Sequence, residues 1–144
     1  MTDTLLIGCD GSDSAKRALE LAATQAKVSH AKVIVAHIIE WSPYTFLTQE
    51  EIAERHKRRQ EEMTRAEAHI TAPIVDTLTQ QGIQAEGIIQ YGNIAKSLCA
   101  ISKDKQVKQI FIGRTGEDSI SDRLFGTVSN TLAQVSPVPV TVVP

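Results

Sequence analysis

Glycines and a threonine at chemically useful positions lie in the stretch GRTGEDSISDRLFGT, residues 113–127, which follows an apolar run and precedes a helical pattern. Gly113 and Gly116 bracket a tight turn at a predicted strand end, where a β-carbon would crowd a ligand, and Gly126 and Thr127 are expected to open the next helix. The free N–H groups of a helix start can bind phosphate oxygens, and the Thr127 hydroxyl can reach a phosphate or a metal ion. On the number of glycines alone, plain turns with Thr127 as a helix cap fit equally well.

A second polar loop, CDGSDSA (residues 9–15), follows the first apolar run of the chain. Open parallel sheets bind ligands beyond the carboxyl ends of their strands, where strand order reverses and adjacent loops diverge. If the strands before these two loops are neighbours, both loops and the starts of two helices face one crevice. Such a crevice is suited to an anion.

The elements that would position these loops alternate between short apolar runs and longer helical patterns, which is typical of an α/β fold with a parallel sheet. Helices are expected at about 13–28, capped by Ser12 or Asp13, from 48 to Gly82 with a kink at Pro73, after Asn93, and from Gly126. The expected strands are 4–9, 32–39, 83–91, 107–113 and 139–143, of which 83–91 reads as weaker and near a sheet edge. We therefore expect one doubly wound domain over residues 1–144, with helices on both faces of the sheet.

Composition narrows the class of protein. The chain has 144 residues, 42% of them hydrophobic, and a formal net charge of −2, which gives no field that favours nucleic acid or an anionic membrane as partner. The basic run 56–59 is flanked by glutamates, as on a solvated helix face. The start of the chain lacks a positive segment followed by a long apolar one, and no apolar run is long enough to cross a bilayer, so we expect a soluble, cytoplasmic protein.

The spacing Gly113, Gly116, Gly126, Thr127 reads G-x2-G-x9-G-[ST] and precedes a final SPVPVTVV segment. This pattern resembles the nucleotide-binding motif of the universal stress protein family. The likeness covers nearly the whole chain: LLIGCDGSDSAKRALELA is similar to the family's first strand, acidic turn and helix, VIVAHII to its second strand, and YGNIAKSL to its third strand-to-helix turn. The resemblance implies a five-stranded parallel sheet in the order 3-2-1-4-5 that binds ATP between the first and fourth strands, generally in a homodimer.

The resemblance also implies roles for single residues. Asp10 would accept hydrogen bonds from the ribose hydroxyls, and adenine would lie against Ile38, with Ile112 and Gly113 as the adjoining wall. The phosphates would meet main-chain N–H groups at four positions: Gly116, Gly126, Thr127 and Val128. Without the motif, Asp10 reads as a turn residue or a helix-entry acid.

Acidic residues in the same loop bear on the metal. Glu117, Asp118 and Asp122 face only Arg114 and Arg123 as opposite charges, so they must point to solvent or share Mg²⁺ with the phosphates. We accordingly expect ATP to bind with Mg²⁺. No Ser, His and acid, and no paired carboxylates, combine into a hydrolytic set, so any ATP turnover is expected to be slow.

Other interpretations use the same residues. CDGSDS partly resembles the phosphate loop of ATP pyrophosphatases, with Asp10 in place of a glycine, and a receiver domain would need an acid where Tyr91 and Gly92 stand. A nucleotide-independent module that binds a partner or a second copy through strand 139–143, short and β-branched, is the main alternative. The main expectation is an ATP-binding regulatory protein of the stress response.

Overall fold

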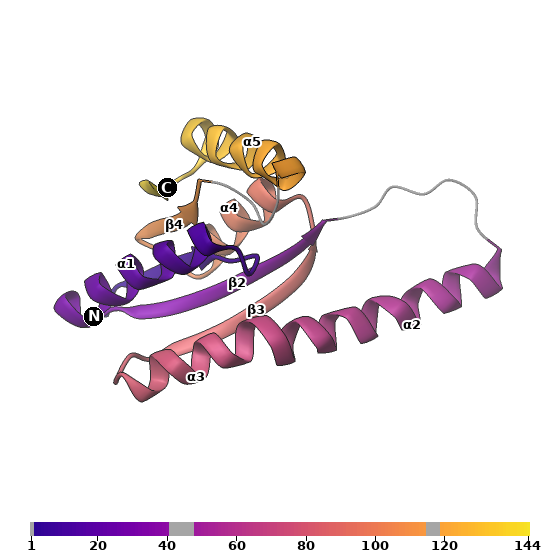
Figure 1. Cartoon of the computed structure of the whole chain (residues 1–144), viewed down its shortest axis with the longest axis horizontal. Helices are drawn as coiled ribbons and strands as arrows, with labels where there is room; N and C mark the ends of the chain where they lie inside the picture. The colour runs from indigo at the N-terminus through magenta and orange to yellow at the C-terminus, as the bar shows by residue number, and fades with distance from the viewer. Residues whose placement is uncertain (1, 41–47, 115–118) are drawn as a thin grey trace.

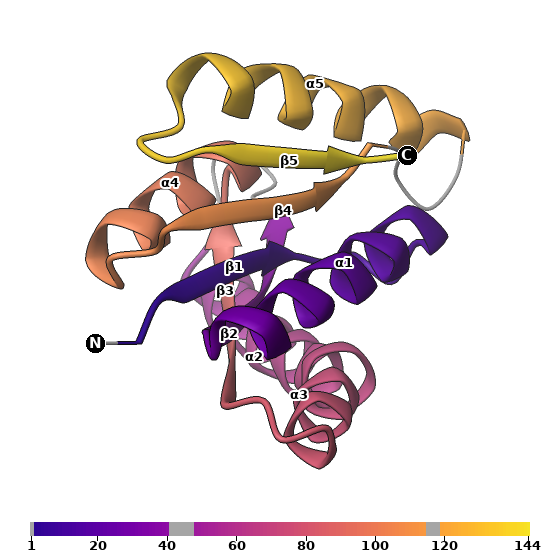
Figure 2. The ribbon, with the colours of Figure 1, turned by 90° about the vertical axis from the view of Figure 1, so that its left-hand side faces the viewer.

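The computed structural model describes residues 2–40, 48–114 and 119–144, with the backbone alone for residues 119–126. Its sheet has five parallel strands in the order β3-β2-β1-β4-β5, which confirms the expected fold class and strand order (Figures 1 and 2). The strands are β1 (Thr4–Gly8), β2 (Lys32–Glu40), β3 (Ala85–Gly92), β4 (Gln109–Gly113) and β5 (Val140–Val143). The expected position of β3 at a sheet edge is also confirmed.

Helices cover both faces of the sheet, as expected. They are α1 (Asp13–Ser29), α2 (Gln49–Ala66), the π-helical segment η1 (Glu67–Thr71), α3 (Ala72–Gln80), α4 (Ile94–Asp104) and α5 (Ser119–Val135). The core on one face joins α1, η1 and α3, and the core on the other joins α4 and α5 (Figure 2). The first turns of α2 extend beyond the sheet, where Glu54 and Arg58 form one of the ion pairs that helical spacing suggests, with 3.1 Å between Oε1 and Nη2 (Figure 1).

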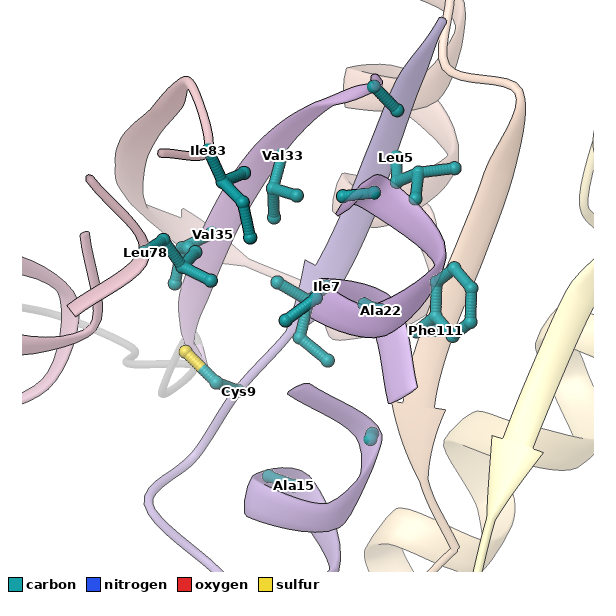
Figure 3. Packing of buried hydrophobic residues seen from close by; sticks show 14 residues of the cluster. Leu5, Ile7, Cys9, Ala15, Ala22, Val33, Val35, Leu78, Ile83 and Phe111 are labelled. Atoms are coloured by element: carbon teal, nitrogen blue, oxygen red, sulfur yellow. The ribbon is translucent and has the colours of Figure 1, made fainter. Parts of the chain in front are cut away.

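Alternation along β1 explains how one short strand supports two cores. Leu5 and Ile7 belong to the core under α1, whereas Leu6 belongs to the core under α4, and all three are at most 1% exposed. On the α1 side, Ala15 and Ala22 allow the helix to lie close to the sheet, as Figure 3 shows. The strands at the centre of the sheet are therefore held from both faces, which fixes where their carboxyl ends lie.

Caps confirm two of the predicted helix starts. Ser12 rather than Asp13 caps α1, because its Oγ accepts a hydrogen bond from the Ala15 N–H at 3.1 Å. Asn93 caps α4 in the same way, through its Oδ1 and the Lys96 N–H at 3.0 Å. In the part of the chain that the structure describes, no helix has both the length and the apolar character needed to span a membrane.

The interruption predicted at Pro73 takes a specific form. The chain widens into η1 just before the proline instead of breaking, because proline lacks an N–H and its ring clashes with the carbonyl four residues earlier in a regular α-helix. The last helix differs from expectation: it begins at Ser119, so the prediction that Gly126 opens it is wrong. A single glycine inside a helix costs only about 1 kcal/mol, which the remaining turns of α5 can offset.

Candidate functional site

The carboxyl ends of β1 and β4 lie side by side, as the argument from the two polar loops required. The two strands pair in parallel, with Gly8 opposite Ile112, and Gly113 ends β4 beside the first turn of α1. The strand order reverses here, since β1 pairs with β2 on its other side. The residues that follow both strands thus share one end of the sheet, the place where doubly wound folds bind ligands.

The turn after β1 holds Asp10 in a defined position. Its Oδ1 accepts a hydrogen bond from the Ser12 N–H at 2.9 Å, and Gly11 between them has a φ of 85°, which favours glycine. Asp10 is half-buried. The reading of Asp10 as a turn residue is therefore correct, and a carboxylate with about four lone-pair sites retains capacity for further donors.

The residue before this turn, Cys9, is tied to β2. His37 donates from Nδ1 to the Cys9 carbonyl oxygen at 2.8 Å, because a carbonyl can only accept, and the Cys9 N–H donates to the Ala36 carbonyl at 2.9 Å. Burial, with a smaller contribution from the negative charge of Asp10, raises the pKa of the Cys9 thiol from 9.0 to about 12. Cys9 is thus a protonated core residue that fixes the base of the Asp10 turn.

A small cavity of about 20 Å³ lies at this end of the sheet. Three predicted site residues line it together: Asp10, Ile38 and Ile112. A cavity of this size holds about one water molecule, whereas sites for drug-sized ligands measure about 300–1,000 Å³. Its lining combines the Asp10 carboxylate with aliphatic side chains, and the cavity would have to widen to admit any ligand larger than water.

Gly113 has a structural reason that sequence analysis did not find. A β-carbon at this position would overlap Ser14 Oγ and lie 2.8 Å from both Ala15 N and Ser14 C. A ligand is therefore not needed to explain the glycine at position 113, because the close approach of β4 and α1 already excludes a side chain there. Gly113 thus brings the end of β4 close to the first turn of α1.

The phosphate-binding residues predicted from the motif fall in different surroundings. Gly116 lies outside the described residues. Gly126 and Thr127 lie inside α5, more than one turn from its start, where their N–H groups belong to the helix rather than to its free first turn. Val128 is buried in the core shared by α4 and α5 and does not line the cavity described above. The proposed phosphate contacts thus remain predictions.

The contribution of α4 to the cavity lining was not predicted, and neither was that of Gly8, Cys9 and Ala36 at the strand ends. Ile94 and Leu98, from the first turns of α4, close the cavity opposite the strands. Their spacing reads as a core stripe, because an apolar side chain follows the same pattern whether it contacts a sheet or a ligand. The available signal was that Asn93 starts α4 directly after β3, so its first turn had to lie at the same end of the sheet. Among the described residues, no group of three or more His, Cys, Asp or Glu side chains could hold a metal ion.

Comparison with known proteins agrees with this architecture. The model of the universal stress protein family matches residues 1–144. A universal stress protein from Thermus aquaticus, encoded in the QAH/OAS sulfhydrylase 3' region, is 33% identical over 147 aligned positions, and YxiE from Bacillus subtilis is 27% identical over 147, each covering 99% of both chains. The solved structure of UspA from Lactobacillus plantarum has a TM-score of 0.82 at 19% identity and covers 99% of this chain and 97% of its own.

Some solved members of the family hold adenine nucleotides. One is a complex with cAMP, with a TM-score of 0.66 and 21% identity, and the match covers 99% of this chain and 97% of that one. Another, from Archaeoglobus fulgidus, is a complex with dAMP, with a TM-score of 0.65 and 19% identity, and the match covers 100% of this chain and 98% of that one. A third, from Arabidopsis thaliana, has AMP bound, with a TM-score of 0.65 and 16% identity, and the match covers 98% of this chain and 90% of that one. At these identities the likeness shows a common fold. With the family model matched along its whole length, the chain belongs to the universal stress protein family.

Proposed function

We propose that this protein binds an adenine nucleotide, ATP with Mg²⁺, at the carboxyl ends of β1 and β4. The observation that carries the proposal is the convergence of Asp10, Ile38 and Ile112 on one cavity at the point where strand order reverses. The adenine nucleotides bound by some family members support the ligand class. ATP as the particular nucleotide rests on the G-x2-G-x9-G-[ST] spacing.

In this proposal Asp10 holds the sugar. Its Oδ1 already accepts the Ser12 N–H, which aims the carboxylate without neutralising it, and the remaining lone pairs accept the ribose hydroxyls. The base enters between Ile38 and Ile112 on the strands and the first turn of α4. Entry requires the α4 side chains to move, because the cavity is much smaller than a base.

The phosphates approach α5 from its amino end, where N–H groups lack helical partners and the helix dipole favours negative charge. Contact with Gly126 and Thr127 requires the turns from Ser119 to Phe125 to open, since both residues lie inside the helix. We therefore expect nucleotide binding to change the start of α5. Such a change at the start of α5, rather than a chemical reaction, would carry the function. We therefore propose a cytoplasmic regulatory protein of the stress response that acts through nucleotide-dependent conformation or association.

Association through β5 is the second part of the proposal. β5 is an edge strand, and the hydrogen bond from Ile110 N–H to the Pro139 carbonyl shows that odd-numbered residues of β5 face β4. The main chains of Val140 and Val142 consequently face outward, and Val142 is 38% exposed. A second copy could pair there about a twofold axis with or without nucleotide, which keeps the nucleotide-independent dimeric module as the alternative function.

Calorimetric titration with Mg-ATP, and separately with AMP and cAMP, tests the nucleotide site. Asp10→Asn keeps an oxygen for the Ser12 N–H and removes the charge, so the fold should persist while affinity falls about tenfold or more, the effect of losing hydrogen bonds to a charged group. Gly126→Val should abolish binding by placing a side chain against the phosphates. Glu20→Gln, an exposed change on α1, is the control. Wild-type protein that binds none of the three nucleotides, or unchanged affinity in both site variants, would refute the proposal.

A further inference from the structure

The outer edge of β3 carries backbone groups whose direction follows from the sheet register. Val33 pairs with Ala85, and the Val33 N–H donates to the Gln84 carbonyl at 2.9 Å. In a parallel ladder this bond means that even-numbered residues of β3 face β2, while the N–H and C=O groups of odd-numbered residues face away. In the described part of the chain, β3 pairs with β2 alone. The outward residues are Ala85, Gly87, Ile89 and Tyr91.

A groove of about 380 Å³ runs beside two of these outward residues. Gly87 and Ile89 form its floor, and Gly87 is exposed. The wall is the flank of the helical run α2–η1–α3, which lies along β3 (Figures 1 and 2). The wall residues include Met63, Thr64, Glu67, Thr71, Val75 and Asp76. A β-carbon at Gly87 would lie 3.2 Å from Thr71 Cβ, so glycine here keeps the strand edge close to the helix wall.

Charge differs between the two ends of this edge. Glu67 and Asp76 are exposed on the groove wall, and the ion pairs found among the described residues include neither of them. At the Tyr91 end, the ring lies 5.2 Å from the Arg59 guanidinium carbon and the hydroxyl donates to Glu62 Oε2 at 2.6 Å. Contacts within the chain thus occupy the Tyr91 end, and two carboxylates flank the open part at Gly87 and Ile89.

We propose that this edge accepts an extended basic peptide as a sixth strand of the sheet. The outward N–H and C=O groups of Gly87 and Ile89 would form the main-chain ladder, and alternate side chains of the peptide would point toward Glu67 and Asp76. Lysine or arginine at those positions matches the wall. A second copy paired about a twofold axis at the same edge would bring two acidic walls together, which favours a basic peptide as the occupant.

The probe is a seven-residue peptide of alternating lysine and threonine, added to the full-length protein. Amide hydrogen exchange followed by NMR should show new protection at Gly87 and Ile89, while the even-numbered amides of β3, already bonded to β2, change little. Two control peptides should not protect these amides: one N-methylated at alternate residues, which removes main-chain donors, and one with glutamate in place of lysine. Absence of protection at millimolar peptide overturns the proposal, as does equal protection by the N-methylated or the acidic peptide.

Reversing the charges on the groove wall distinguishes binding in the groove from a general attraction of the protein for cations. Glu67→Lys with Asp76→Lys should weaken binding of the lysine peptide about three- to tenfold, as expected for two exposed charge pairs. Glu20→Lys with Asp104→Lys changes the net charge equally at exposed positions outside the groove, and should leave the affinity unchanged. Three results would overturn the proposal. The first is equal weakening in both double variants, and the second is protection at Val140 and Val142 of β5 instead of β3. The third is protection of Gly87 and Ile89 by self-association, without peptide.

Discussion

Replacement of Gly113 by alanine tests the contact that joins β4 to α1. The added β-carbon would overlap Ser14 Oγ, which can rotate away, and would lie 2.8 Å from Ala15 N and Ser14 C, which are backbone atoms and cannot. Relief therefore requires the strand end and the first turn of α1 to separate. Overpacking of this kind costs about 1–3 kcal/mol, and backbone overlap places Gly113→Ala at the upper end, about 3 kcal/mol. For a chain of this size the unfolding midpoint should fall by about 10 °C.

Urea unfolding followed by circular dichroism measures this loss, with Gly8→Ala as the matched control. A β-carbon at Gly8 would meet Leu98 Cδ1 at 3.3 Å, the end of a side chain that can shift, so the control should lose less than about 1 kcal/mol. Equal stability of the two variants would refute the packing argument. If Gly113→Ala were as stable as wild type but failed to bind nucleotide, the glycine would serve the ligand, as the loop sequence first suggested.

Two further predictions concern the thiol beside the candidate site and the free edge of β5. Burial and the nearby Asp10 charge raise the pKa of the Cys9 thiol from 9.0 to about 12. Between these two pH values the unfolded chain binds fewer protons than the native one. The free energy of unfolding should therefore fall by up to about 1.4 kcal/mol per pH unit above pH 9. Cys9→Ala should remove that part of the alkaline slope in urea unfolding, and identical slopes would contradict the assignment. In analytical ultracentrifugation, Val142→Lys should convert a dimer to a monomer, whereas Val135→Lys, exposed on α5, should not; a monomeric wild type would exclude the β5 dimer.

Most of the fold could be predicted because its signals are local. Buried parallel strands appear as short apolar runs, and the helices between them carry apolar stripes and polar caps such as Ser12 and Asn93. The predicted and observed strand boundaries differ by one or two residues. For example, β4 begins at Gln109 rather than Val107, because Val107 has a buried side chain but precedes the first residue that pairs with a neighbouring strand. The strand order came from family resemblance, because periodicity does not show which strands are neighbours.

The candidate site was less predictable, since its residues meet through tertiary contacts. Asp10 could be placed at a strand end, but the Ser12 N–H that orients it depends on the turn geometry at Gly11. The steric reason for Gly113 lies in α1, about a hundred residues away in the chain. The sequence does not show where α5 begins, because a glycine followed by a threonine is typical of a helix start, whereas in the structure the helix begins seven residues earlier, at Ser119.

The wide π turn of η1 has a consequence for how the chain tolerates changes in length. Four core-facing side chains, Ala66, Ile70, Ile74 and Leu78, recur at intervals of four residues, a spacing that drifts around a regular α-helix with about 3.6 residues per turn. The π turn takes up the extra residue and brings the stripe back into phase with the sheet. Deletion of the exposed Ala68 would restore α-helical spacing to the four contacts, but it would also place Pro73 inside a regular α-helix, where its ring clashes with the carbonyl four residues earlier. The chain therefore does not tolerate loss of a residue here, because the π turn fits the proline and the apolar stripe at the same time.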